Sequence, residues 1–447
     1  MAQSFAREGS TPAARAAAQL EWNQFFTDPQ LQKLLHLATD DNRDLRVAMQ
    51  RIEEARALYG IRRADQLPSI SAGLSAARLH APTNVSGANL DVTQYTASLA
   101  LSSWELDFWG RVSSLKAAAL ESYLATVEAK RALQISLVAQ IANTYLLERD
   151  LDERLTTARQ TLATRDEAYR IMRRRYEVGS ISKLDATQAE ILRDQTLAEL
   201  DVLEQQKERA HNALTLLVGT PLRVESVPLS AIENAFAPDI APGLHSDVLL
   251  DRPDVLAAEH RLKAANANIG AARAAFFPRI ALLGALGTSS SELDGLFGTD
   301  TKLWLFVPTI SLPLFDGGRN QANLSLSEAR KNIAVADYEH TIQNAFREVA
   351  DSLADRRWLA KQVAVQQSII ATQDERVRLA QLRYQNGASS FLEVLDAERD
   401  QFAAEQALVQ TRRALLASTV SLYTALGGGP NNEQATVSNN PSDMDPK

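Results

Sequence analysis

Acidic side chains follow a glycine at two places in the chain, and they are the strongest candidates for chemistry. Residues 175–192 read RYEVGSISKLDATQAEIL and residues 383–400 read RYQNGASSFLEVLDAERD. The pattern Arg-Tyr-x-x-Gly-x-x-Ser-x-Leu followed by a carboxylate therefore occurs twice. Carboxylates that gather around one point attract cations, whereas isolated ones pair with a nearby base on a solvated helix surface. The repeated motif predicts one of these two arrangements.

Other classes of chemical site are missing from the sequence. It has no nucleophile motif, no GxxxxGK phosphate loop and no HxxxH or HExxH spacing among its six histidines. With no cysteine, disulfides and thiolate metal sites are excluded. The DGGR sequence at 316–319 fits a strand-to-helix joint better than a phosphate-binding turn. We therefore expect a protein that is not an enzyme and that uses neither cofactor nor metal.

The composition favours long helices rather than several compact cores. Aromatic residues make up only 6% of the 447 residues, while alanine, leucine and glutamate are abundant. The net charge of −8, without a long basic run, gives no indication of nucleic acid. Neither a signal peptide at the N-terminus nor a run of 18 apolar residues is present. Taken alone this suggests a soluble protein, unless targeting has been removed and strands cross the membrane.

The repeat divides the chain into two halves. Gly179 and Gly387 lie 208 residues apart, which is too long a period for a solenoid. In each half, 68 residues without glycine or proline precede this glycine and 39 follow it. A 68-residue helix would be about 100 Å long and needs a partner of similar length. We infer that two shorter helices stack end to end alongside the 68-residue helix. They are the 39-residue helix and residues 40–67, or residues 251–277 in the second half.

Between the helices, four segments have the composition and period of strands. Pro68 and Pro278 end the preceding helices, and residues 95–102 then alternate between larger and small polar side chains. The other candidate strands lie in residues 69–79, 279–287 and 302–315. Two hairpins in one chain cannot close a barrel, but several copies of the chain could form one across a membrane. A soluble β-sandwich capping a coiled coil is the alternative.

Several motifs carry a family resemblance over nearly the whole chain. They are RYQNGASSFLEVLDAERD, LLDRPDV (249–255), ANANIGAARAAFFPRI (265–280), PLFDGGRNQA (313–322) and ALGGGP (425–430). In this order and spacing the chain resembles the TolC/OprM-type outer membrane factors, in particular the OprM-like (NodT) branch of multidrug efflux channels. The resemblance implies an α+β membrane protein in the outer membrane of a Gram-negative bacterium, extending into the periplasm. Three chains would form a 12-stranded transmembrane β-barrel, with four strands each, and a periplasmic α-barrel of coiled-coil helices.

The resemblance also implies a division of the chain. Residues 1–39 and 221–250, together with the C-terminal tail, would form an equatorial region around the tunnel, and the tail at 429–447 would be polar and disordered. The first repeat is expected at 40–220, with strands near 69–109, a long helix at 110–178, a tip at 179 and a helix at 180–218. The second is expected at 251–428, with strands near 279–316, a long helix at 318–386, a tip at 387 and a helix at 388–426.

The implied function is that of an exit duct in a tripartite efflux pump. The channel would passively conduct drugs or other small toxic compounds from the periplasm to the exterior. Its partners would be two further copies of the chain, a periplasmic adaptor (membrane fusion) protein, an inner-membrane pump of the resistance-nodulation-division (RND) type and outer membrane lipid. A type I secretion duct and a soluble coiled-coil structural protein are the alternatives. Many members of the branch begin with a lipid-modified cysteine, which this sequence lacks. The sequence fits either an engineered form without the anchor or an unlipidated member.

The resemblance assigns the repeated motif to the periplasmic entrance. The residues that match the gate, or lie beside it, are Asp185, Tyr384, Leu392, Glu393, Asp396 and Arg399. Those that match the hairpin tips, where an adaptor or pump would bind, are Gly179, Ser180, Gly387 and Ala388. Leu392 and Asp396 match the closed aperture, and Tyr384 with Asp185 matches a pair that ties neighbouring coils together. Ser389 departs from TolC itself, which has an arginine there. Opening would be an iris-like outward swing of the second half's inner coil.

Overall fold

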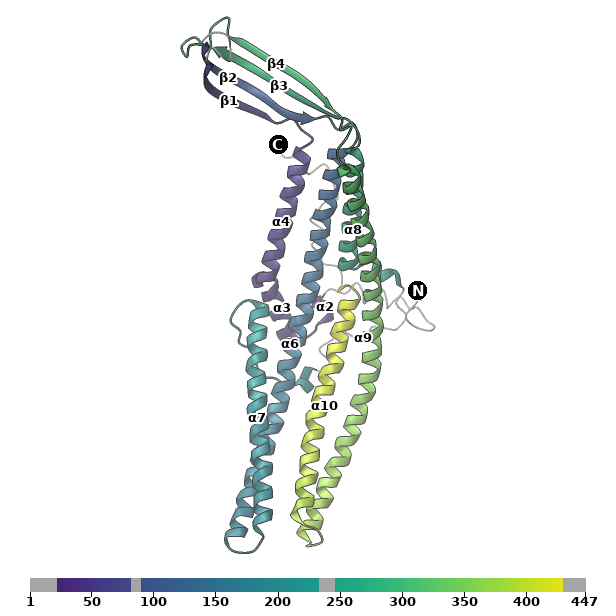
Figure 1. Ribbon diagram of the computed structural model, residues 1–447. Helices are drawn as coiled ribbons and strands as arrows, with labels where there is room; N and C mark the ends of the chain where they lie inside the picture. Colours follow the sequence, from purple (N-terminus) through teal and green to yellow (C-terminus); the bar gives the residue numbers. More distant parts are fainter. Residues whose placement is uncertain (1–21, 82–89, 233–245, 429–447) are drawn as a thin grey trace. The chain divides into compact units, whose positions relative to one another are not determined.

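The computed structural model describes residues 22–81, 90–232 and 246–428 (Figure 1). Expectations for residues 1–21, 233–245 and 429–447 lie outside the described residues. The chain forms two compact units. The first contains the residues up to Ala48, Lys130–Pro253 and the residues from Ile342 onward, and the second contains Met49–Ala129 and Asp254–Thr341. Each unit is described by itself below.

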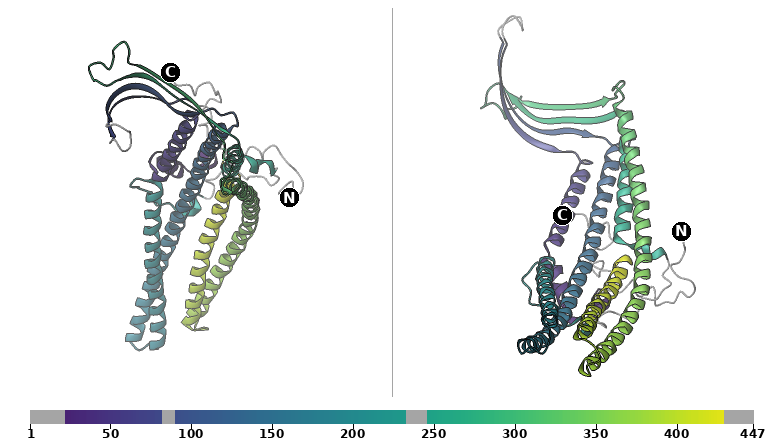
Figure 2. Two further views of the ribbon diagram at one scale, coloured as in Figure 1. Left: turned by 45° about the horizontal axis from the view of Figure 1, so that its top comes forward. Right: turned by 60° about the horizontal axis from the view of Figure 1, so that its bottom comes forward.

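Two helical hairpins dominate the first unit (Figures 1 and 2). In the first hairpin, α6 (Arg111–Glu177) is followed by α7 (Lys183–Val218). In the second, α9 (Arg319–Gln385) is followed by α10 (Phe391–Ala425). Both long helices have 67 residues, and each begins in the second unit. The repeat that the glycine spacing indicated is therefore present in the helices themselves.

The hairpins pack through small and branched apolar side chains. Leu151, Leu155 and Ala158 of α6 form a buried cluster with Leu203 and Ala210 of α7. Phe402 of α10 packs against the same cluster. The residues on α6 recur at helical spacing, so one face of α6 is buried along these turns. This packing joins the second hairpin to the first.

The described part of the first unit also contains short helical segments, and one of them ends where a continuous helix was expected. These segments are α2 (Trp22–Phe25), α3 (Pro29–Asp41) and the 3₁₀ turns η1 (Leu229–Ile232) and η2 (Ser246–Asp251). The sequence predicted an unbroken helix from Asp40, but α3 ends at Asp41 and α4 (Arg43–Ala64) begins after Asn42. Asn42 explains the break, because its Oδ1 accepts from the Leu45 amide at 2.9 Å. A side chain that caps a new helix in this way competes with continuation of the old one.

The shorter helices of each half meet at their ends, as their lengths predicted. Asn42 donates its Nδ2 to the Leu217 carbonyl at 2.7 Å, which places the end of α7 against the start of α4. Gly219, which ends α7 with φ 87°, lies so close that an added Cβ would be 2.6 Å from the Asp41 oxygen. In the second half, Arg252 directly precedes α8 (Pro253–Ala274) and donates to the Ala425 carbonyl at the end of α10, at 2.8 Å.

The second unit contains one antiparallel sheet in the order β1-β2-β3-β4. Its strands are β1 (Ile70–Ala81), β2 (Leu90–Glu105), β3 (Arg279–Ser290) and β4 (Lys302–Ser311), two from each half as predicted. Directly paired residues share a face, and Leu99, Leu286 and Trp304 form one such row. These three side chains are 54%, 65% and 75% exposed.

The opposite face of the sheet is more polar. The residues that share it include Ser71, Ser75, Thr96, Ser98 and Ser289. Strand β4 departs from this pattern, since Leu303 and Leu305 also lie on this second face. The sheet is therefore apolar on one face and mostly small or polar on the other. None of the helices in residues 22–81, 90–232 and 246–428 carries an apolar stretch long enough for a membrane crossing.

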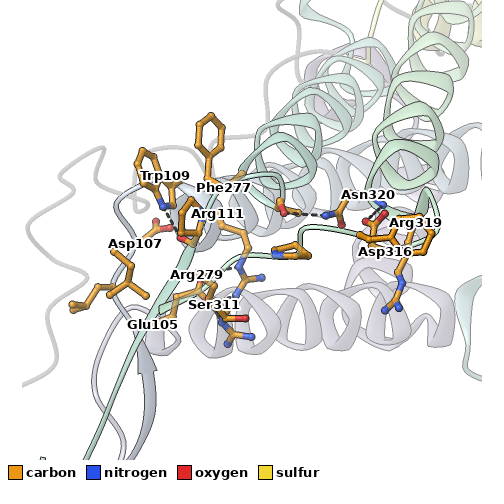
Figure 3. Close-up of a pocket in the computed structure, with 17 residues that line it drawn as sticks. Glu105, Asp107, Trp109, Arg111, Phe277, Arg279, Ser311, Asp316, Arg319 and Asn320 are labelled. Carbon is orange, nitrogen blue, oxygen red and sulfur yellow. Dashed lines mark hydrogen bonds and ion pairs between the residues drawn. The ribbon is translucent and has the colours of Figure 1, made fainter. Parts of the chain in front are cut away.

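Carboxylates cap both long helices where they leave the strands, around a cavity of about 470 Å³ (Figure 3). Asp107 accepts from the Val112 and Ser113 amides at 2.9 and 2.7 Å at the start of α6. Asp316 accepts from the Gly318 and Asn320 amides at 2.9 and 2.8 Å at the start of α9. The DGGR sequence is thus a helix-capping joint, as the sequence favoured.

Candidate functional site

The two hairpin tips have the same backbone structure. Gly179 and Gly387 adopt φ values of 75° and 70°, the left-handed region in which glycine is unstrained. One residue further, the Ser180 amide bonds to the Arg175 carbonyl at 2.8 Å, and the Ala388 amide bonds to the Arg383 carbonyl at 2.8 Å. This is the Schellman pattern of helix ends. All four predicted tip residues are exposed, so they are accessible for contacts with another protein.

Asp185 belongs to the cap of α7. The Ser182 hydroxyl accepts from the Asp185 amide at 3.1 Å and donates to the Asp185 carboxylate at 2.7 Å. The same carboxylate accepts from the Ser182 amide at 3.3 Å, which completes a capping box. In this chain, therefore, Asp185 fixes the start of α7 through local bonds.

Tyr384 links the two hairpins. Its hydroxyl accepts a hydrogen bond from Nη1 of Arg175 at 2.8 Å, and this bond joins α6, which carries Arg175, to α9, which carries Tyr384. Its ring lies 5.0 Å from the ring of Phe391 and packs against a cluster that contains Ala380 and Val394. Within one chain the partner of Tyr384 is thus Arg175 rather than Asp185. Sequence reasoning missed Arg175 as a site residue, although it is the first residue of the repeated motif.

The remaining predicted residues lie on the first turns of α10. Leu392 is 42% exposed, which suits a side chain that can contact another surface. Asp396 pairs with Arg399 at 3.1 Å, one turn along the helix. Glu393 lies 3.6 Å from Nε of Arg383. Within a single chain, the acids of the second tip therefore have basic partners, as on an ordinary solvated helix surface.

A further ion pair ties the first turns of α10 to α9. Arg376 donates to Asp400 at 2.6 Å, and Arg399 contacts the same carboxylate at 3.3 Å. The hydrogen bond from Arg376 lowers the pKa of Asp400 from its ordinary value, with Arg399 contributing. Asp400 is thus ionised at neutral pH and shares Arg399 with Asp396.

Comparison with known proteins identifies the family. A model of the outer membrane efflux protein family matches residues 34–220 and 244–428. The chain belongs to this family. It is 45% identical to the outer membrane protein OprJ of Pseudomonas aeruginosa over 92% of this chain and 86% of OprJ. It is 43% identical to the toluene efflux pump outer membrane protein TtgF of Pseudomonas putida, over 94% of this chain and 88% of TtgF.

Solved structures of the family agree with the fold. The open state of the MtrE outer membrane channel of Neisseria gonorrhoeae matches with a TM-score of 0.86 at 38% identity, covering 96% of both chains. A membrane protein from Pseudomonas aeruginosa matches with a TM-score of 0.84 at 42% identity, over 95% of this chain and 98% of that one. The resemblance inferred from the motifs is therefore confirmed.

Membership in the outer membrane efflux protein family settles the broad function. The protein is an outer membrane exit channel of a tripartite efflux pump in Gram-negative bacteria, and it extends into the periplasm. It is a component of a transport system and not an enzyme. A soluble coiled-coil structural protein, the competing interpretation of the sequence, is inconsistent with this membership.

Sequence reasoning also missed a buried run of charges on α6, residues 148–154. Asp152 contacts Lys207 at 2.5 Å, and Arg154 donates Nε to the side-chain oxygen of Gln406 at 2.6 Å. Burial raises the pKa of Asp150, against the lowering effect of Arg154 and Arg413. A charged run is usually solvated, so its inward orientation follows only from the packing of α7 and α10 around α6.

Proposed function

We propose that three copies of this chain form one continuous tunnel, through which small organic compounds leave the periplasm for the exterior. The observation that carries this proposal is the sheet of the second unit. Among the described strands, β1 and β4 each pair on one side only, so both edges of the sheet are open. Open edges in lipid would leave backbone groups without hydrogen bonds, and closure into a barrel removes them.

The chemistry of the two faces supports a transmembrane barrel. The row of Leu99, Leu286 and Trp304 gives the outer face that lipid requires. The face with Ser98 and Thr96 gives a polar lumen. Four strands are too few to close a barrel around a channel, and three copies supply the 12 strands proposed here. Lipid of the outer membrane would then cover the exposed apolar side chains.

The aperture is proposed at the hairpin tips. Around a threefold axis, three copies of Leu392 would form an apolar constriction, and three copies of Asp396 a ring of carboxylates. Such a ring attracts cations and disfavours anions. The ring needs neighbouring chains, since within one chain Asp396 is paired with Arg399 at 3.1 Å. We propose Glu393 and Arg399 as secondary members of the same entrance.

The lock on this aperture is proposed to include Tyr384 and Asp185, together with Arg175. The hydrogen bond from Arg175 to Tyr384 spans the two hairpins of one chain. Asp185 lies in the first turn of α7 and is available to a neighbouring coil only at the expense of its bonds to Ser182. Breaking these contacts would allow the second hairpin to swing outward.

The proposed partners are a periplasmic adaptor and an inner-membrane pump of the RND type. A passive channel supplies neither energy nor selection of cargo, so both must come from such partners. The exposed tips at Gly179, Ser180, Gly387 and Ala388 are the proposed docking points. The names of relatives refer to efflux of toluene and antibiotics, which supports small organic cargo over polypeptides.

Conductance across a planar lipid bilayer tests the channel and the lock together. We expect small, cation-preferring steps for the protein and larger steps for the Tyr384→Phe/Asp185→Ala double variant. Tyr176→Phe is the matched control, because Tyr176 is the equivalent of Tyr384 in the first repeat. Equal steps in all three proteins would retain the channel and refute the lock. Silence of all three despite confirmed membrane insertion would refute the channel.

A further inference from the structure

We propose that Arg165 is a positioning residue for the aperture. Its contacts set how far from the tips the two hairpins separate, and beyond Arg165 the hairpins stay together. The proposal rests on the gate described above, because it states where the outward swing of the second hairpin pivots. Arg165 lies on α6 and makes hydrogen bonds to both α7 and α10, the helices that flank it in the two hairpins (Figure 1). It touches neither the tunnel entrance residues nor the tips, and it acts through α10.

The side chain of Arg165 bridges both hairpins from a buried position. Only 4% of the residue is exposed. Within its own hairpin, Nη1 donates to the Thr196 hydroxyl and to the Leu192 carbonyl of α7, the latter at 3.4 Å. Toward the second hairpin, Nη2 donates to the backbone carbonyl of Glu398 in α10 at 3.3 Å. The guanidinium carbon also lies 5.2 Å from the ring centre of Phe402.

This arrangement resists separation because of what separation would expose. A buried guanidinium loses hydration. The hydrogen bonds of Nη1 and Nη2 and the aromatic face of Phe402 offset this loss in part, while Nε is buried without a hydrogen-bond partner. Burial lowers the pKa of Arg165, while the nearby Glu398 carboxylate opposes this effect. If α10 moved away alone, Arg165 would keep its bonds to α7 but lose both contacts on α10. The contact therefore favours one fixed distance between α6 and α10 at this level.

The second repeat does not contain this contact. At the 208-residue offset, Arg165 corresponds to Gln373 and Thr196 corresponds to Ala404. The guanidinium and the hydroxyl that anchor it are thus both specific to the first half. A feature needed only for coiled-coil packing would be expected in both halves, whereas a pivot within each chain is needed only once.

Three arginines on α6 contact the second hairpin at successive levels. Arg154, which is 8% exposed, bonds to Gln406, and Arg165 bonds to Glu398. Arg175, near the tip, bonds to Tyr384 in an exposed position. These arginines are 11 and 10 residues apart, close to three helical turns, so they share one side of α6. Water competes most easily with the exposed contact. Separation of the two hairpins therefore begins at the tip and stops at Arg165.

The stop at Arg165 determines how the aperture residues move. Asp396 lies two residues before Glu398 on α10, about 3 Å along the helix axis. A pivot at the Glu398 carbonyl therefore moves Asp396 little. Leu392, six residues before Glu398 and about 9 Å along the helix axis, moves further, and the tip at Gly387 swings through the largest arc. Without the Arg165 contact, α10 would leave α6 along a longer stretch, and the entrance would widen further.

Distances between spin labels test the pivot, and the absence of native cysteine makes labelling specific. The lower pair is Val178→Cys with Gln385→Cys, and the upper pair is Val202→Cys with Ala403→Cys. All four native residues are exposed. Labelled chains are mixed with an excess of cysteine-free chains, so that most assemblies contain one pair. Distances are then measured in detergent by pulsed electron paramagnetic resonance.

We expect Tyr384→Phe to broaden the distances of the lower pair and to leave the upper pair sharp. Adding Arg165→Met should broaden the upper pair too and increase conductance in the bilayer beyond that of Tyr384→Phe. Phe402→Leu, which leaves the buried hydrogen bonds in place, should cause part of this change and serves if Arg165→Met does not assemble. The control is Arg159→Gln, since Arg159 pairs with Glu204 at 3.0 Å on the exposed side of the same helix.

Two results would overturn the pivot. The first is a broad upper pair in Tyr384→Phe alone, and the second is a sharp upper pair in the double variant with Arg165→Met. A sharp lower pair in Tyr384→Phe refutes the proposed lock instead, and Arg165→Met then tests the pivot by itself. In that case, unchanged upper-pair distances in Arg165→Met refute the pivot.

Discussion

Removing the hydroxyl of Ser182 should weaken the start of α7 much more than the equivalent change weakens α10. Ser182 and Ser390 occupy the same position of the repeated motif and cap their helices with similar backbone angles. Ser182 makes a full capping box with Asp185, whereas the Ser390 side chain makes no capping bond. The pair Ser182→Ala and Ser390→Ala therefore changes the same atoms in two nearly identical backbones.

The magnitude follows from the bonds that each variant loses. Ser182→Ala loses the bond from the Asp185 amide at 3.1 Å and the bond to its carboxylate at 2.7 Å. Loss of an N-cap side chain costs about 1 kcal/mol, which is roughly a fivefold change in a local opening equilibrium. Ser390→Ala loses no capping bond, so the expected change for α10 is near zero.

Hydrogen exchange of the first-turn amides measures this difference directly. The Asp185 amide should exchange about fivefold faster in Ser182→Ala than in the native protein. The Glu393 amide, its equivalent in α10, should exchange at an unchanged rate in Ser390→Ala. Equal acceleration at both tips would refute the reasoning, because it would mean that the capping box contributes nothing beyond the serine itself.

Three further predictions concern stability, measured as the apparent melting temperature of the detergent-solubilised protein. Gly219→Ala should lower the melting temperature, because it should cost more than about 1 kcal/mol of folding free energy: φ is 87° and the new Cβ would lie 2.6 Å from the Asp41 backbone oxygen. An unchanged melting temperature would contradict this close approach. Gly60→Ala should raise it, since Gly60 lies within α4 with no neighbour within 4 Å and alanine is favoured over glycine in a helix by roughly 0.5–1 kcal/mol. A decrease would mean that this helix surface is covered in the assembly. Glu405→Gln should raise it at pH 8 and less so toward pH 4. Burial and the like charge of Asp374 raise the pKa of Glu405. The folded native protein therefore loses stability as the pH rises through this pKa and Glu405 ionises. A gain that is independent of pH would exclude titration of Glu405 as its cause.

Much of the helical architecture was predictable because glycine and proline punctuate it. Positive φ at Gly179 and Gly387 is strained for other residues, so these glycines mark the tips reliably. The break at Asn42 was not predictable from periodicity. It depends on a bond to Leu217, which is distant in sequence and becomes a neighbour only when α7 folds back.

The candidate site was predictable only in part for a similar reason. The repeated motif located the tips, and the family resemblance selected Tyr384 and Asp185. The partner of Tyr384 is Arg175, an exposed arginine whose bond across the hairpins no local pattern reveals. Comparison of the two repeats offers a usable signal, because Arg165 replaces the glutamine found at position 373. Positions where the halves differ indicate contacts that only one half makes.

The same comparison explains why the second tip, rather than the first, is suited to move. The first tip is stabilised by local bonds, since Asp185 and Ser182 form the capping box at the start of α7. In the second tip the equivalent acid, Glu393, pairs instead with Arg383 at 3.6 Å, and Ser390 is left without a capping bond. Its helix α10 therefore depends for its position on contacts with other helices, at Glu398 and at Tyr384 of the adjoining α9. Contacts between helices can break without unfolding either helix, whereas loss of a capping box frays the helix that the box begins. The sequence repeats the tip in backbone but varies its bonds, so in the opening proposed here the first copy would be the fixed support and the second the part that swings.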